Sequence, residues 1–183
     1  MTSNEIYSIL NKDQLKNSLE KYLFLQTNLK KVNVSKDKIF QKKYNGFYRM
    51  RQRNQKFYQI YFEFMEKKKN SNIEFEDIFS YLVENTGRYE ASFSSKFIAT
   101  INPNKPVWDK YVMENTGIKI PYYNCKKRKE KIIDAYNKLC DWYESYMFTN
   151  EAKEIIHQFD LIYPNTKITD IKKIDLFLWQ NRK

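Results

Sequence analysis

The chain contains very little glycine, proline or histidine. Its 183 residues include 3 glycines, 4 prolines and a single histidine, His157. Glycine-rich phosphate loops, dinucleotide-binding fingerprints and the nucleophile elbow of serine hydrolases each need closely spaced glycines, and the glycines here stand at positions 46, 87 and 117. One histidine is too few for a multi-histidine metal centre or a histidine-rich hydrolytic site. The sequence therefore predicts no metal and no cofactor.

Cysteine and long apolar runs are also scarce. Cys125 and Cys140 lie 15 residues apart, which matches neither a zinc pattern nor a disulfide framework, and we expect two buried thiols in a reducing compartment. No stretch approaches 18 uncharged apolar residues, and charged residues interrupt the apolar ones in residues 1–16. We expect a cytoplasmic protein that does not act at a membrane.

Aromatic residues are abundant, at 17% of the chain, and apolar residues recur at spacings of three and four. This spacing is typical of amphipathic helices, and no alternating pattern is long enough to build a sheet. The helices predicted from spacing, caps and turn residues cover about 13–26, 35–45, 54–68, 72–86, 90–101, 110–115, 124–148, 151–159 and 169–180. We therefore expect a compact all-α domain over residues 1–183, monomeric and built from seven to nine helices.

The positive charge is concentrated in two blocks. The formal net charge is +11; residues 36–56 carry eight basic residues and one acid, and residues 119–131 carry six basic residues and one acid. The rest of the chain is close to neutral. A local excess of this kind indicates a polyanionic partner.

The first block interleaves its cations with aromatic and amide side chains, a mixture that binds phosphates and stacks on bases. Double-stranded DNA is the predicted partner. The simplest alternative is that the two basic blocks are solvent-exposed helix faces that bind no partner. An anionic membrane surface is less favoured, because neither block has a clean apolar face beside its cations.

The most unusual segment covers residues 86–109. It reads as a glycine turn with a cation, a helix with small residues, a loop bracketed by two prolines, and an aspartate at the start of the next helix. Residues 73–116 resemble the helix-hairpin-helix DNA glycosylase superfamily, which includes endonuclease III and 8-oxoguanine glycosylase. The resemblance implies that Gly87 and Arg88 close a hairpin turn on a DNA phosphate, that 90–101 is its second helix, and that the following loop presents Asp109.

Three features of that family are missing here, and one of them is the set of cysteine ligands that holds an iron–sulfur cluster in some relatives. The turn holds one glycine, and no lysine stands at the start of the second hairpin helix, so the resemblance implies no lyase chemistry. Hydrolysis of an N-glycosidic bond requires mainly a carboxylate near the sugar. This carboxylate stabilises the positive charge of the transition state and orients the attacking water. The resemblance therefore implies a catalytic role for Asp109; its alternative role is an ordinary helix cap.

Base flipping would also need phosphate anchors, a wedge and walls for the extruded base. The candidate DNA-binding residues are Arg49, Arg51, Arg53, Gly87, Arg88, Lys96, Lys126, Lys127 and Arg128. The candidate wedge and pocket residues are Tyr48, Gln52, Trp108 and Tyr111. Each has a simpler interpretation as well: Lys96 as an ordinary surface cation, and Trp108 as part of the core or an anchor for its loop.

The leading hypothesis is a monofunctional, metal-independent DNA glycosylase that removes a damaged or modified base, in repair or in defence against phage. One alternative is a non-catalytic DNA-binding protein on the same scaffold. Another is a protein whose basic blocks meet an acidic protein surface. Steep weakening by salt would distinguish phosphate binding from the last of these.

Overall fold

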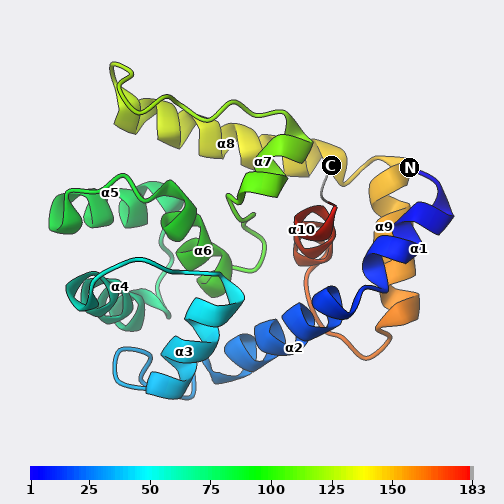
Figure 1. Cartoon of the computed structure of the whole chain (residues 1–183), viewed down its shortest axis with the longest axis horizontal. Coiled ribbons are helices and arrows are strands. Elements are labelled where there is room, and N and C mark those ends of the chain that lie inside the picture. Colours follow the sequence, from blue (N-terminus) through cyan, green and yellow to red (C-terminus); the bar gives the residue numbers. More distant parts are fainter. Residues whose placement is uncertain (182–183) are drawn as a thin grey trace. The chain divides into compact units, whose positions relative to one another are not determined.

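Residues 1–181 are described by a computed structural model, and every regular element among them is a helix (Figure 1). The helices are α1 (Ser3–Leu10), α2 (Asp13–Asn28), α3 (Lys38–Phe47), α4 (Gln55–Lys68), α5 (Phe75–Thr86), α6 (Ala91–Ile101), α7 (Lys110–Thr116), α8 (Arg128–Tyr146), α9 (Asn150–Ile162) and α10 (Asp170–Gln180). The predicted all-α class is confirmed. The described residues contain ten helices, one more than the upper end of the expected range.

Short polar side chains cap four of these helices at the residue that the sequence predicts. Asn54 accepts the backbone N–H of Phe57 at 2.9 Å to cap α4, and Thr169 caps α10 in the same way. Gly87 and Gly117 end α5 and α7 at φ 65° and φ 71°, a left-handed conformation that costs glycine little.

Several expectations about helix boundaries were wrong. Helix α3 begins at Lys38 and not at residue 35, and it continues through Gly46 to Phe47 instead of ending at residue 45. Helix α1 was not predicted, although Thr2 and Glu5 form a reciprocal capping box at its start. Helix α8 begins at Arg128 and not near residue 124, because Lys127 has a φ of 54° and breaks the helical backbone there. Residues 118–127 are consequently a loop.

The chain divides into two compact units. Unit 1 comprises Met1–Asn17 and the described part of Pro103–Lys183, and unit 2 is Ser18–Asn102. The segment 73–116, which carries the resemblance to DNA glycosylases, is therefore divided between the two units. Within residues 1–181, no helix combines the length and apolar character needed to cross a bilayer.

Unit 2 is built around a cluster of aromatic rings contributed by α3, α4 and α6. The hydroxyls of Tyr44 and Tyr61 lie 2.8 Å apart, and Tyr61 donates to the carbonyl of Phe93 at 2.9 Å. These bonds satisfy polar atoms that would otherwise be buried without partners. Burial raises the pKa of both tyrosines well above the usual value.

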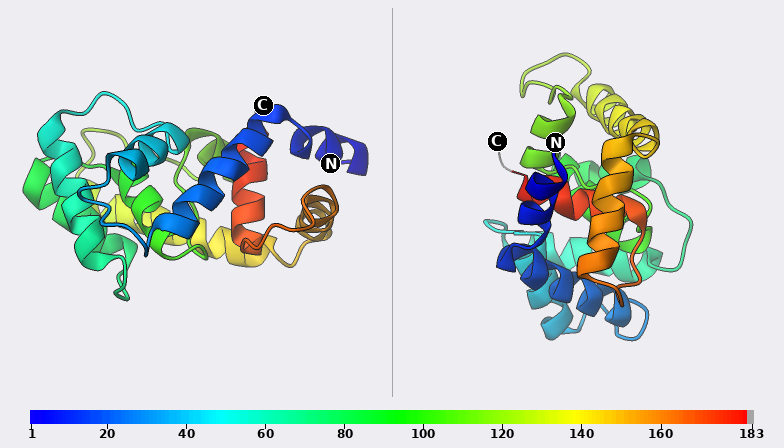
Figure 2. Two further views of the ribbon diagram at one scale, coloured as in Figure 1. Left: turned by 90° about the horizontal axis from the view of Figure 1, so that it is seen from below. Right: turned by 90° about the vertical axis from the view of Figure 1, so that its right-hand side faces the viewer.

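Unit 1 surrounds α10, which packs against α1, α7 and α9 (red in Figure 2). Lys172 and Asp175 of α10 form a buried ion pair at 2.7 Å, and Tyr143 of α8 donates to Asp175 at 2.7 Å. The N–H of Val107 also donates to this carboxylate, at 3.3 Å. Burial raises the pKa of Tyr143 well above its usual value, and the neighbouring Asp175 raises it further. This polar centre fixes the loop that leads into α7.

Candidate nucleic-acid interface

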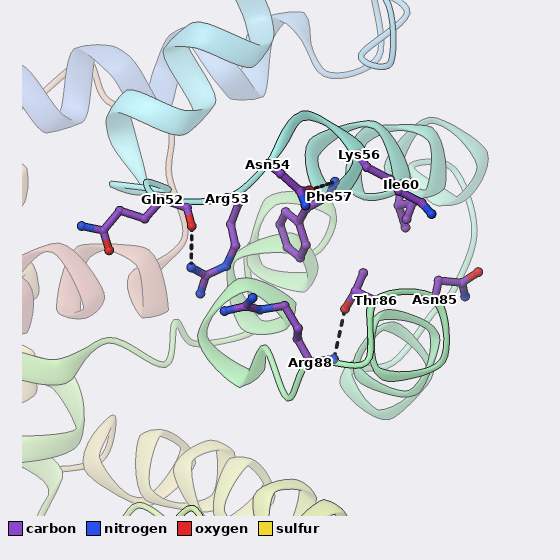
Figure 3. Close-up of a pocket in the computed structure, with 9 residues that line it drawn as sticks. All are labelled: Gln52, Arg53, Asn54, Lys56, Phe57, Ile60, Asn85, Thr86 and Arg88. Atoms are coloured by element: carbon purple, nitrogen blue, oxygen red, sulfur yellow. Dashed lines mark hydrogen bonds between the residues drawn. The ribbon is translucent and has the colours of Figure 1, made fainter.

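A pocket of about 230 Å³ lies in unit 2 between the start of α4 and the turn that joins α5 to α6 (Figure 3). It is lined by Gln52, Arg53, Asn54, Lys56, Phe57, Ile60, Asn85, Thr86 and Arg88. Three of these side chains are cations and three are amides, whereas no carboxylate lines the pocket. The lining is therefore suited to an anion.

Local backbone geometry positions the two segments that form opposite walls of the pocket. On one side, residues 49–53 approach α4 with left-handed backbone at Arg49 (φ 52°) and Gln52 (φ 61°). On the other side, Gly87 reverses the chain after α5, and the N–H of Arg88 donates to Thr86 Oγ1 at 3.3 Å. Positive φ is uncommon for residues other than glycine, so tertiary packing must hold the first wall in place.

Glu90 organises the charge beside the pocket. Its two carboxylate oxygens accept from Arg53 Nε at 2.9 Å and Arg53 Nη2 at 3.0 Å, and Oε1 also accepts from Arg88 Nε at 2.9 Å. The Glu90 side chain is only 10% exposed. Arg53 and Arg88 are 35 residues apart in the sequence, yet their guanidinium groups bind the same carboxylate. Figure 3 shows the two groups pointing toward one another.

Arg53 and Arg88 differ in how much of each guanidinium group remains accessible to a ligand. Arg53 is 20% exposed, all three of its guanidinium nitrogens donate within the protein, and the group lies 5.0 Å from the ring centroid of Phe93. Arg88 is 57% exposed and donates to Glu90 through Nε. A guanidinium has five N–H donors, so Arg88 is oriented by Glu90 while its outer edge faces solvent. With exposed Lys56, it presents positive charge to a ligand.

The structure brings together Gln52, Arg53 and Arg88 from the predicted DNA-binding set, at the turn that contains Gly87. Arg53 is nevertheless assigned as a structural cation and not as a phosphate contact, because its side chain is only 20% exposed and each of its three guanidinium nitrogens already donates within the protein. Arg49 and Arg51 are exposed on the segment that precedes the pocket.

Two other predicted residues of unit 2 are buried. Lys96 is 6% exposed, with its ammonium 5.1 Å from the ring centroid of Phe93, so it is neither a surface cation nor placed to contact a phosphate. Tyr48 is buried in the aromatic cluster, where its hydroxyl accepts from Thr100. Its ring therefore cannot form the wall of a base pocket as placed.

In unit 1, Asp109 caps α7 by accepting the N–H of Tyr111 at 3.0 Å, and its side chain is half-buried. The structural alternative for this residue, a helix cap, is thus present in the fold. Trp108 is buried, so it anchors its loop and offers no open face to a base. The half-buried ring of Tyr111 lies beneath the ammonium of Lys110, at 5.8 Å.

The second basic block begins in the loop before α8. Lys126 and Lys127 are exposed, and the guanidinium of Arg128 lies 4.6 Å from the ring centroid of Tyr123. The expectation of two buried thiols was wrong, because Cys125 in this loop and Cys140 in α8 are both half-buried.

Sequence reasoning missed the role of Glu90 and the exposure of Tyr122 and Tyr123. Glu90 is the only acid between residues 88 and 108, which was a visible signal for a partner of nearby arginines. The tyrosine pair belongs to no apolar stripe and lies within the second basic block, which is a signal for exposed rings.

Among residues 1–181, no group of three or more His, Cys, Asp and Glu side chains is arranged to hold a metal ion. Comparisons with protein-family models, with curated proteins and with solved structures found no match. Any functional assignment therefore depends on the chemistry of the side chains themselves.

Proposed function

We propose that this protein binds DNA and that the unit 2 pocket anchors a backbone phosphate. The observation that carries the proposal is the cationic pocket itself: Arg88, held by Glu90 at 2.9 Å, and Lys56 line one concave surface that contains no carboxylate. The planar guanidinium suits a phosphate, with which it can form two parallel hydrogen bonds. Asn54, Asn85 and Gln52 add amide donors at the rim.

The charge distribution favours a polymeric ligand with many phosphates over a small anion. The first basic block, residues 36–56, runs directly into the pocket and carries exposed Arg49 and Arg51. Phosphates along a duplex recur every few ångströms, so a line of exposed cations next to an anchoring pocket can contact several at once. Contacts of this kind position the duplex and are largely independent of base sequence.

The test is fluorescence anisotropy with a labelled 20-base-pair duplex at several salt concentrations. We expect R88A and K56A each to weaken binding by about three- to tenfold, and each to reduce the slope of log K against log salt by about one. K67A is the matched control, since Lys67 is exposed and lies in α4 like Lys56, but outside the pocket. The DNA affinity of K67A should stay within twofold of that of the parent protein. Equal effects of the three variants, or no salt-sensitive binding, would overturn the proposal.

A second candidate is hydrolysis of an N-glycosidic bond with Asp109 as the catalytic carboxylate. One observation favours it: the loop that leads to this half-buried side chain is fixed at several points. Tyr136 donates to the carbonyl of Pro106 at 3.1 Å, Thr169 donates to that of Pro103 at 2.7 Å, and Val107 donates to Asp175. A catalytic carboxylate needs such a rigid support to stay in a productive position.

Substitution of Asp109 by asparagine separates chemistry from capping. Asparagine caps helices about as well as aspartate, so D109N should fold with unchanged stability. If the protein is a glycosylase, duplexes with damaged or modified bases will yield alkali-sensitive sites with the parent protein and none with D109N, at equal DNA affinity. If D109N and the parent cleave equally, the catalytic role of Asp109 is refuted.

A further inference from the structure

The loop that precedes α8 exposes two neighbouring aromatic rings. Tyr122 and Tyr123 are 86% and 79% exposed, and the backbone bond from the N–H of Cys125 to the carbonyl of Tyr122, at 3.2 Å, forms the turn that carries them. Burying two large rings would stabilise the fold, so an adjacent exposed pair forgoes that gain. An adjacent pair of exposed rings is a candidate contact surface for a partner.

Positive charge surrounds these rings. The cations of residues 119–131 are Lys119, Lys126, Lys127, Arg128, Lys129 and Lys131, against the single acid Glu130. The Arg128 guanidinium lies 4.6 Å from the Tyr123 ring centroid. Because Tyr123 remains mostly exposed, this cation covers one face of the ring and leaves the rest open to solvent.

We propose that this aromatic and basic loop binds single-stranded nucleic acid. Unpaired bases would stack on Tyr122 and Tyr123 while the neighbouring lysines contact the phosphates. Flat rings beside a cationic track are the common means of holding single strands without sequence preference. A paired duplex offers no exposed base face to these rings except at its ends, so the preferred ligand is unpaired.

Two other partners fit the same surface less well. A membrane would need a broad apolar face, and the loop adds only exposed Ile120 to its two tyrosines before the run of lysines begins. An acidic protein would be attracted by the lysines, but its carboxylate side chains offer no flat face to stack on the two tyrosine rings. The inference does not rest on the proposed duplex binding, because it concerns residues of unit 1 and not the unit 2 pocket.

The experiment measures anisotropy of fluorescein-labelled dT15 and U15 with the full chain at 50 mM salt. We expect Y122A and Y123A each to weaken dT15 binding by at least fivefold, and Y122F, which keeps the ring, to stay within twofold. The slope of log K against log salt should be unchanged in Y122A but smaller by about 0.7 in K126A. The ratio of dT15 to U15 affinity identifies the sugar that is preferred.

F148A is the matched control, since Phe148 is another strongly exposed aromatic residue of unit 1, outside the basic block. Its effect on dT15 affinity should stay within twofold. Several outcomes would overturn the inference: no binding of either strand below about 100 μM, effects of Y122A and Y123A below twofold, or capture by anionic vesicles without binding of dT15 or U15. None of these readouts depends on R88A or K56A, so failure here is distinguishable from failure of the proposed function.

Discussion

The ion pair between Arg53 and Glu90 should contribute strongly to the stability of unit 2. Two unit charges about 4 Å apart attract by about 4 kcal/mol at an effective dielectric constant of about 20. Here the carboxylate accepts two bonds from one guanidinium, at 2.9 and 3.0 Å, with both side chains at most 20% exposed. Loss of solvation on folding offsets part of this attraction, whereas removal of one partner leaves the other poorly compensated.

We therefore expect R53A to lower the free energy of unfolding by about 2–4 kcal/mol. The decrease is limited by Arg88, which still donates to Glu90 in that variant. R88A should cost less than about 1 kcal/mol, because its side chain is 57% exposed and the pair is largely screened. The contrast between the two arginines follows directly from their exposure.

A double-mutant cycle isolates the interaction. Urea unfolding of the parent, R53A, E90A and R53A/E90A, followed by far-ultraviolet circular dichroism, should give a coupling free energy of about 1.5–3 kcal/mol. Equal m-values across the four proteins are the control for unchanged compactness of the states. A coupling below about 0.5 kcal/mol would refute the assignment of Arg53 as a structural cation and return it to the candidates for DNA contact.

Three further predictions concern ionisation and strain. Burial raises the pKa of Cys140 to about 11, so in a C125S background this thiol should react with iodoacetamide at pH 8 at least tenfold more slowly than free cysteine, and urea should remove the difference. Because the folded pKa values of Tyr44 and Tyr143 exceed the unfolded value of about 10, their contribution to stability is present below pH 10 and lost as the pH rises further; tyrosinate absorbance that reaches its full value while helicity is intact would contradict this. Q52G removes a side chain held at φ 61° and should raise the free energy of unfolding by about 0.5–1 kcal/mol, whereas a decrease would show that the Gln52 side chain itself holds the segment.

Helix boundaries were predictable where they depend on neighbours in the sequence. The cap at Asn54 and the turn at Gly87 follow from contacts within three or four residues, and both stand where the sequence predicts them. The same local signal existed for α1, in Thr2 and Glu5, and was not used. The start of α8 was not predictable in this way, because nothing local in the sequence marks Lys127 as left-handed.

The roles of the charged residues were less predictable. Sequence reasoning treated Arg53, Arg88 and Lys96 alike, as cations for phosphate. In the fold, Arg53 is engaged by Glu90, Lys96 is buried in α6, and Arg88 faces solvent. What separates them is the distance to a carboxylate or an aromatic ring that lies elsewhere in the chain, and no local pattern contains that information.

By itself, the sequence determined that the chain is helical, where most helices start and end, and that its positive charge gathers in two blocks. These properties depend on residue type and on short-range spacing. Only the tertiary structure decided which cations are paired within the fold and which are exposed to a ligand. It also decided that Trp108 is buried while Tyr122 is open to solvent. Burial and pairing are set by residues distant in sequence, so they arise only when the helices pack.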